Sequence, residues 1–154
     1  MFKKGGDKLE QFFDYILNDN EEVIIKGLKG NIKLADIVIP DQINGHPVTE
    51  IANYAFSNMK TLKTISFSKE MKKIGIAAFK NSGIESVTIS NNIRLVGVES
   101  FSDYKSSKAG HRRIYVDNKE VIISEEDCVL LDKYLQEKSE YFQKVAEIKK
   151  RAKT

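Results

Sequence analysis

Side chains that commonly carry covalent or metal chemistry are scarce in this sequence. It contains one cysteine, Cys128, and two histidines, His46 and His111. A histidine can activate a cysteine as a nucleophile, but neither the spacing nor the neighbouring residues favour such a pair here. These three residues also cannot form a four-ligand zinc site without carboxylates. The sequence therefore predicts no catalytic residue, no metal ligand and no cofactor.

Local motifs for phosphate, serine or calcium chemistry are missing as well. The sequence has no Gly-rich phosphate loop, no Gly-x-Ser-x-Gly turn, no His-Glu-x-x-His helix and no EF-hand loop. Catalytic groups can be scattered along a chain. An enzyme is therefore kept as the third and least favoured hypothesis.

Binding chemistry is better represented, above all in a basic segment from 105 to 113 that contains no acid. Guanidinium groups can hold carboxylates or phosphates through paired hydrogen bonds, and arginine and tyrosine often anchor interfaces. We expect this segment to contact an acidic partner surface, although a solvated loop is an equal alternative. The residues assigned to the contact are Lys105, Lys108, Arg112, Arg113 and Tyr115.

The element that must position these residues is a repeat. Phe56, Phe79 and Phe101 lie 23 and 22 residues apart, and each follows an aliphatic residue by five positions. A fixed period of 22–23 residues is typical of a leucine-rich-repeat solenoid. Each unit supplies one short strand and one aromatic side chain, which it cannot bury alone. Stacked units would form a continuous core and a parallel sheet.

The segment from Gly30 to Phe56 closely resembles the entry repeat of BspA-type leucine-rich-repeat proteins. It has a strand ending in Ile39-Pro40, a turn of the form Ile-Asn-Gly-x-Pro-Val, then Ile51 and Ala55-Phe56. Shorter segments that end at Phe79 and Phe101 resemble two further units. The resemblance covers residues 23–116. It implies a binding scaffold, often on bacterial or protozoan surfaces, and does not imply catalysis.

We expect one domain over residues 1–154, an α/β repeat solenoid with a helix at each end. Its parts are an N-terminal capping helix in 1–21, the solenoid in 22–123 and a long C-terminal helix in 124–154. The first helix is predicted over 7–19 from an apolar stripe at helical spacing. That stripe consists of Leu9, Phe12, Phe13, Ile16 and Leu17.

Strand alternation predicts two outward-facing rows across the sheet. One row is Asp36, Thr64, Ser86 and Arg113, and the other is Val38, Ser66, Thr88 and Tyr115. The two middle strands would then offer a face of hydroxyl groups, formed by Thr64, Ser66, Ser86 and Thr88. This face is either a second binding surface or a set of side chains that simply suit a sheet.

The C-terminal helix has an apolar stripe that continues further than three thin coils could cover. Tyr141, Phe142, Val145 and Ile148 lie in its second half. An exposed apolar stripe usually marks an interface. We predict that it packs on a partner or on a second copy in a homodimer, unless the helix folds back along the solenoid.

The net charge and the composition of the whole sequence limit the class of protein. A net charge of +3 is too low to indicate a nucleic-acid binder, and one cysteine fits a reducing compartment. Acidic residues interrupt any apolar signal stretch near Met1, and no membrane span is predicted. We therefore expect a cytoplasmic protein-interaction module, an adaptor or an inhibitor that masks a partner surface. The alternative is a nucleic-acid binder that uses the basic loop 105–113 and the basic tail 149–153.

Overall fold

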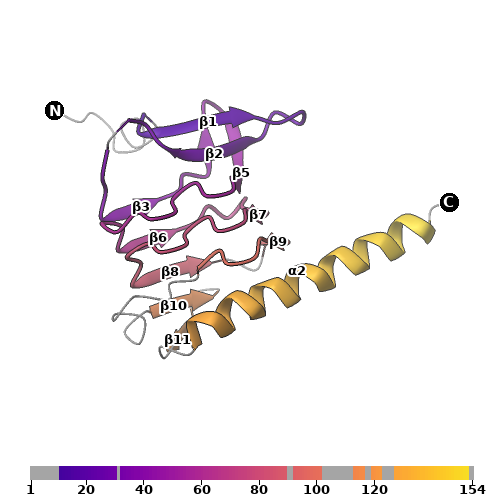
Figure 1. The fold of residues 1–154 in the computed structure, drawn as a ribbon. Helices are drawn as coiled ribbons and strands as arrows, with labels where there is room; N and C mark the ends of the chain where they lie inside the picture. The colour runs from indigo at the N-terminus through magenta and orange to yellow at the C-terminus, as the bar shows by residue number, and fades with distance from the viewer. Residues whose placement is uncertain are drawn as a thin grey trace.

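The computed structural model describes residues 11–30, 32–89, 92–101, 113–116, 119–122 and 127–152. These residues form short strands and one long helix (Figure 1). The strands are β1 (Phe13–Leu17), β2 (Val23–Leu28), β3 (Asp36–Val38), β4 (Gln42–Ile43), β5 (His46–Ile51), β6 (Thr64–Ser66), β7 (Lys73–Ile74), β8 (Ser86–Ile89), β9 (Leu95–Val96), β10 (Arg113–Val116) and β11 (Lys119–Ile122), and the helix is α2 (Asp127–Ala152).

The strands form two sheets that enclose the core. Sheet A has the order β1-β2-β5-β7-β9, with β4 attached to β5, and sheet B has the order β11-β10-β8-β6-β3. Neighbouring strands from β2 to β9 and from β3 to β10 are parallel. Antiparallel strands β1 and β11 close one edge of each sheet. Each coil passes from a strand of sheet B to a strand of sheet A, which confirms the predicted repeat.

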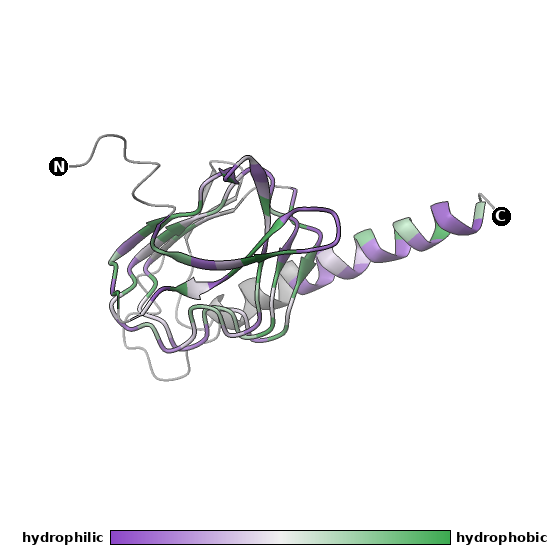
Figure 2. Ribbon diagram, turned by 90° about the horizontal axis from the view of Figure 1, so that it is seen from above, coloured by the Kyte–Doolittle hydropathy of each residue, from purple (hydrophilic) through white to green (hydrophobic). Residues whose placement is uncertain are grey.

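The register of the coils places equivalent side chains on top of one another. Phe79 stacks on Phe56 and on Phe101, with ring centroids 5.3 Å apart in both pairs. All three rings are at most 2% exposed. Hydrophobic and hydrophilic residues alternate along the coils, as strands with one buried face require (Figure 2). The predicted aromatic column is therefore confirmed.

Small residues allow the coils to approach each other. A Cβ atom added to Gly75 would lie 2.5 Å from the backbone nitrogen of Asn53, and one added to Gly97 would clash with the backbone of Ile76. Ser100, which precedes Phe101, is fully buried and donates its hydroxyl hydrogen to the carbonyl oxygen of Gly75 at 3.0 Å. Small residues at these positions therefore permit the close packing of the coils.

The predicted helix over 7–19 is wrong for the part that the structure describes. Residues Phe13–Leu17 form β1, which pairs with β2 through a turn at Asn18. The side-chain oxygen of Asn18 accepts hydrogen bonds from the backbone N–H groups of Asn20 and Glu22, at 2.9 and 3.0 Å. Pairing satisfies the backbone groups along the edge of β2 more regularly than a covering helix would. Residues 1–10, the rest of the prediction, lie outside the described residues.

The predicted C-terminal helix is confirmed as α2. It passes the open edge of β9 and projects beyond both sheets (Figure 1). Ser139 is buried there, and its hydroxyl oxygen accepts a hydrogen bond from the backbone N–H of Val96 at 3.3 Å. The sequence also predicts a strand over 32–39 that ends at Pro40, but only Asp36–Val38 form one, as β3.

Candidate functional site

The outward face of sheet B carries the predicted hydroxyl rows. The strand register aligns Asp36 with Thr64 and Ser86, and Val38 with Ser66 and Thr88. The Thr64 hydroxyl donates to an Asp36 carboxylate oxygen at 2.6 Å, and Val38 is 57% exposed. Thr64, Ser66 and Thr88 are partly exposed. This face carries partly exposed hydroxyl groups, and the Thr64 hydroxyl also joins β6 to β3.

The basic segment is only partly placed. Arg113 and Tyr115 lie in β10, opposite Ser86 and Thr88 of β8, so the backbone brings them into the predicted outward rows. Their side chains, and that of Ser86, are not among those described. Lys105, Lys108 and Arg112 lie outside the described residues, and the contact that they were predicted to make stays a prediction.

A groove lies where α2 crosses the beginning of β9, and we call it the β9–α2 groove. It has a volume of about 520 Å³ and is open to solvent. Five of its lining residues are spaced along one side of α2, and the other two come from the start of β9. The lining residues are Arg94, Leu95, Phe142, Gln143, Val145, Ala146 and Lys149.

The walls of the β9–α2 groove combine apolar surface with positive charge. The Arg94 guanidinium lies 4.1 Å above the centre of the Phe142 ring, which is a favourable cation–π distance. The Phe142 ring also meets Tyr141 edge to face, with centroids 5.5 Å apart. Lys149 begins the basic last turn of α2, together with Lys150 and Arg151. No acidic residue lines the groove.

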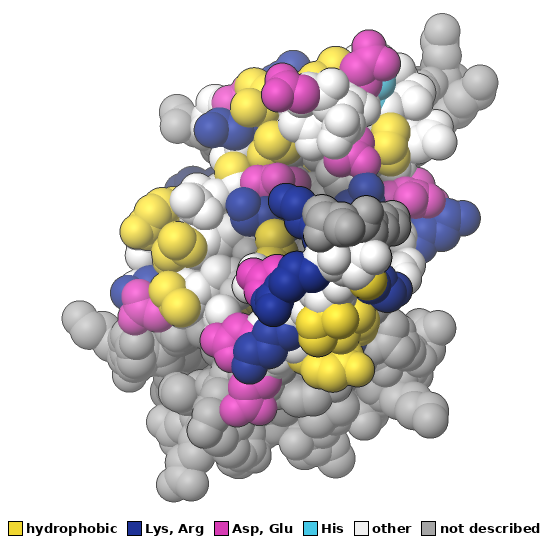
Figure 3. Space-filling view, turned by 90° about the vertical axis from the view of Figure 1, so that its right-hand side faces the viewer, with side chains coloured by type: hydrophobic (Ala, Val, Ile, Leu, Met, Phe, Trp, Pro, Cys, Tyr) yellow, Lys and Arg dark blue, Asp and Glu magenta, His cyan; other side chains and the backbone are white. Residues whose placement is uncertain are grey.

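The exposed apolar side chains of α2 adjoin this groove. Tyr141 and Ile148 are each 62% exposed, and Val145 lies between them along the helix and is partly exposed. Figure 3 views the projecting helix nearly end-on, with a hydrophobic cluster on one flank and charged side chains on the other. Of the predicted site residues, the structure brings Tyr141 and Phe142 together at this surface.

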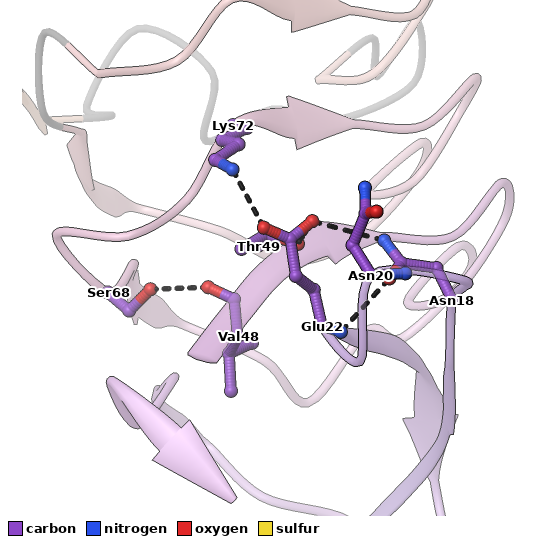
Figure 4. A network of polar contacts seen from close by, with 7 residues as sticks. All are labelled: Asn18, Asn20, Glu22, Val48, Thr49, Ser68 and Lys72. Carbon is purple, nitrogen blue, oxygen red and sulfur yellow. Dashed lines mark hydrogen bonds and ion pairs between the residues drawn. The ribbon is translucent and has the colours of Figure 1, made fainter. Parts of the chain in front are cut away.

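A polar network surrounds the Glu22 carboxylate (Figure 4). The carboxylate accepts hydrogen bonds from Lys72 Nζ at 2.8 Å, from the Asn18 amide at 3.1 Å and from the Thr49 hydroxyl at 3.4 Å. The hydrogen bond from Lys72, then that from Asn18, holds the Glu22 pKa below its ordinary value. A carboxylate held this way is a weak base. The network therefore joins coils rather than performing chemistry.

The described residues contain no cluster suited to metal binding. No group of three His, Cys, Asp or Glu side chains within them could hold a metal ion. The ring nitrogen Nδ1 of His46 lies 2.9 Å from the carbonyl oxygen of Glu21, which gives this histidine a structural contact. None of the helical residues described forms a segment long and apolar enough to cross a membrane.

Stacked coils with two parallel sheets and an aromatic column define a protein of the leucine-rich-repeat class. The chain belongs to the BspA type leucine rich repeat family, whose region model matches residues 26–114 in six copies. Proteins of this class are protein-interaction modules and are typically non-enzymatic. The predicted family is thereby confirmed.

Two solved structures are similar to the chain. A T. pallidum leucine-rich-repeat protein is 21% identical with a TM-score of 0.44, and the match covers 59% of this chain and 64% of that one. A leucine-rich cell surface protein from Faecalibacterium prausnitzii is 24% identical with a TM-score of 0.52, over 65% of this chain and 27% of that one. The chain thus spans only part of each. No curated protein matches it.

Several groove residues were not predicted from the sequence. Arg94, Leu95, Gln143 and Ala146 become neighbours only because α2 crosses β9 at this point. Their distance along the chain gave no signal of that crossing. The one available clue was the apolar stripe of α2, which led to Tyr141 and Phe142.

Proposed function

We propose that this protein is a protein-interaction module, an adaptor or an inhibitor, whose partner docks on the β9–α2 groove and the adjoining stripe of α2. One observation carries the proposal. The helix continues past the edge of β9 and leaves Tyr141 and Ile148 each 62% exposed beside an open groove. Burying a large side chain of this kind contributes about 1.5–3 kcal/mol, so a partner that covers both gains substantially.

The choice between adaptor and inhibitor depends on the number of surfaces in use. Sheet B and the projecting helix lie on different sides of the molecule (Figure 1). An adaptor would hold a second partner on the outward face around Thr64 and Thr88 while the groove is occupied. An inhibitor needs the groove alone, and the bulk of the coils would then mask the partner surface. Detection of a ternary complex distinguishes the two.

Two other uses of α2 compete with a partner protein. The basic last turn, Lys149 to Arg151, supports contact with nucleic acid, and phosphate contacts would make affinity fall steeply with salt. The exposed stripe also supports a homodimer through two copies of α2. Light scattering on the purified protein tests the homodimer, and a salt titration with an oligonucleotide tests the nucleic acid.

Site-specific photo-crosslinking tests the docking site directly. A photoreactive amino acid is placed at position 148 on α2, and in a matched protein at position 38, which is also exposed but lies on sheet B. We expect a defined protein adduct in the source cells from position 148. The adduct should be recovered with the purified partner in vitro. An adduct from position 38 alone would move the docking site to sheet B.

The cytoplasmic location remains part of the proposal and rests on the single cysteine, which fits a reducing compartment. Fractionation of the source cells tests it. Recovery of the protein in the membrane or external fraction would contradict it.

A further inference from the structure

We propose that the β9–α2 groove receives an acidic amphipathic helix of the partner protein, with an apolar side chain in the groove and carboxylates facing Arg94 and Lys149. This inference rests on the proposed function and adds the chemistry of the partner. It begins from the composition of the groove. The residues that line it carry two positive charges and no negative charge, around an apolar floor formed in part by Phe142 and Val145.

The segment that binds in the groove must combine two properties, an apolar side chain and negative charge. An apolar side chain suits the groove, because contact with Phe142, Val145 and Ala146 would cost a polar group its hydrogen bonds to water. The Lys149 ammonium attracts carboxylates, and the Arg94 guanidinium, which lies over the Phe142 ring, adds to the positive charge of the groove. An elongated segment also fits an open groove better than a small molecule, which pockets usually bury for the most part.

A helix fits better than an added strand. The edge of β9 is where a strand would add, but the Val96 N–H already donates to the buried hydroxyl of Ser139. A strand would have to displace α2 to reach that edge. The exposed stripe of Tyr141, Val145 and Ile148 instead repeats at helical spacing, so the side chains of a neighbouring helix can interleave with it.

Charge also favours an acidic partner over a second copy of this chain as the occupant of the groove. Residues 136–152 of α2 contain five cations, Lys138, Lys144, Lys149, Lys150 and Arg151, and three acids, Glu137, Glu140 and Glu147. A second α2 that lies parallel to the first would bring its basic last turn beside the groove, and this like charge weakens association. A helix that is acidic beside its apolar stripe is complementary to both the groove and the basic last turn.

The test measures binding of a defined peptide to the intact protein by fluorescence anisotropy. The probe is a labelled helical peptide of about 18 residues, or roughly five turns, with leucines on one stripe and glutamates beside it. One control peptide has the same composition in scrambled order, and another has lysines in place of the glutamates. We expect the acidic amphipathic peptide to bind at least about tenfold more tightly than either control at about 150 mM salt.

Two pairs of variants test whether the peptide binds in the groove. Ala146→Trp fills the groove, whereas Lys144→Trp adds the same ring at an exposed helix position that does not line it. Lys149→Glu reverses a charge in the groove, whereas Lys144→Glu reverses a charge at an exposed helix position outside both the groove and the basic last turn. We expect the groove variants to weaken binding about tenfold and the controls about twofold or less. If Ala146→Trp does not fold, the lysine pair decides the question.

Three results would overturn the inference. The scrambled acidic peptide binds as well as the amphipathic one, or each groove variant binds like its control, or a dimer forms and is abolished by Ala146→Trp. The first would reveal general attraction to the basic turn, and the last would assign the groove to a second copy. If the photo-crosslink from position 148 identifies a partner protein that has no acidic helix, the inference is overturned. The proposed function would then still stand.

Discussion

The stacked coils and α2 differ in how completely the chain itself satisfies their side chains. In the coils, Phe79 has an equivalent aromatic ring at 5.3 Å on both sides and is 1% exposed. In α2, Ser139 is buried against β9, but Tyr141 two residues later is 62% exposed. Residues that pack on their own repeat are fixed by folding. The outer face of α2 is not used by folding, and it is where we place function.

The same contrast applies to the edges of sheet A. β1 closes the first edge by antiparallel pairing with β2, through backbone groups on both sides. At the other edge, α2 takes the place of a further strand, and the hydroxyl of Ser139 accepts from Val96. A helix satisfies a strand edge less regularly than a strand does. The space left between α2 and β9 forms the β9–α2 groove.

The largest expected effect lies in the aromatic column. Phe79→Ala should lower the free energy of unfolding by about 3–5 kcal/mol, because it removes a buried ring between two others. Urea denaturation measures the change. Tyr54→Ala is the matched control, since Tyr54 is an exposed aromatic at 62%, and it should cost within about 0.5 kcal/mol. Similar losses for both variants would show that the column does not stabilise the coils.

A smaller loss is expected where the coils approach most closely. Gly75→Ala should destabilise the protein by about 1–3 kcal/mol, because the new methyl group would lie 2.5 Å from the backbone nitrogen of Asn53. Thermal melting checks the change. Gly30→Asn is the control, since nothing lies within 4 Å of a Cβ atom there and Asn tolerates its φ of 56°. A neutral Gly75→Ala would mean that the coils can move apart freely.

The coils were predictable because their signal is repeated. Phe56, Phe79 and Phe101 share a period with the aliphatic residues before them, so one register accounts for the strands of every coil. Alternation within those strands then gave the outward rows of sheet B, which the pairing of β3, β6, β8 and β10 bears out. The polar face and its residues followed from this register alone.

The N-terminal element could not be predicted this way. Phe13, Ile16 and Leu17 fit a helical stripe, yet Ile16 is 51% exposed and Leu17 is 42% exposed in β1. The turn at Asn18 and the open edge of β2 determined the structure instead. Nor could the groove be predicted, because the place where α2 crosses β9 depends on packing between distant segments. Periodicity within α2 identified its stripe but not its neighbours.

The contact between the stacked coils and α2 gives the next prediction. Ser139→Ala should cost about 1 kcal/mol, because it leaves the buried Val96 N–H without its acceptor, an effect that the better helix propensity of alanine partly offsets. Hydrogen exchange should become faster at the Val96 amide while the amides of β5 stay protected. Unchanged exchange at Val96 would show that another group satisfies this amide and that α2 does not cap the edge.

The smallest effect is a pH dependence at the opposite edge of sheet A. Because Lys72 and Asn18 lower the Glu22 pKa from 4.5, the Glu22 contribution is present above the unfolded-state value and is lost as pH falls through the folded-state value. Lys72 is 57% exposed, so solvent screening limits the pair to about 0.2–1 kcal/mol. Glu22→Gln should therefore lower stability at pH 7 and have little effect at pH 3.

Glu21→Gln is the matched control for this measurement, because it makes the same chemical change one residue earlier, outside the Glu22 network. Its stability difference from the wild type should stay nearly constant between pH 7 and pH 3. A constant difference for Glu22→Gln as well would show that the Lys72 contact does not stabilise the coils. Since β9 lies at the other edge of the sheet from β1 and β2, Glu22→Gln should leave peptide binding at the groove unchanged at pH 7. A loss of binding would mean that the coils and α2 are coupled, and that the division between a folded scaffold and a separate docking helix is wrong.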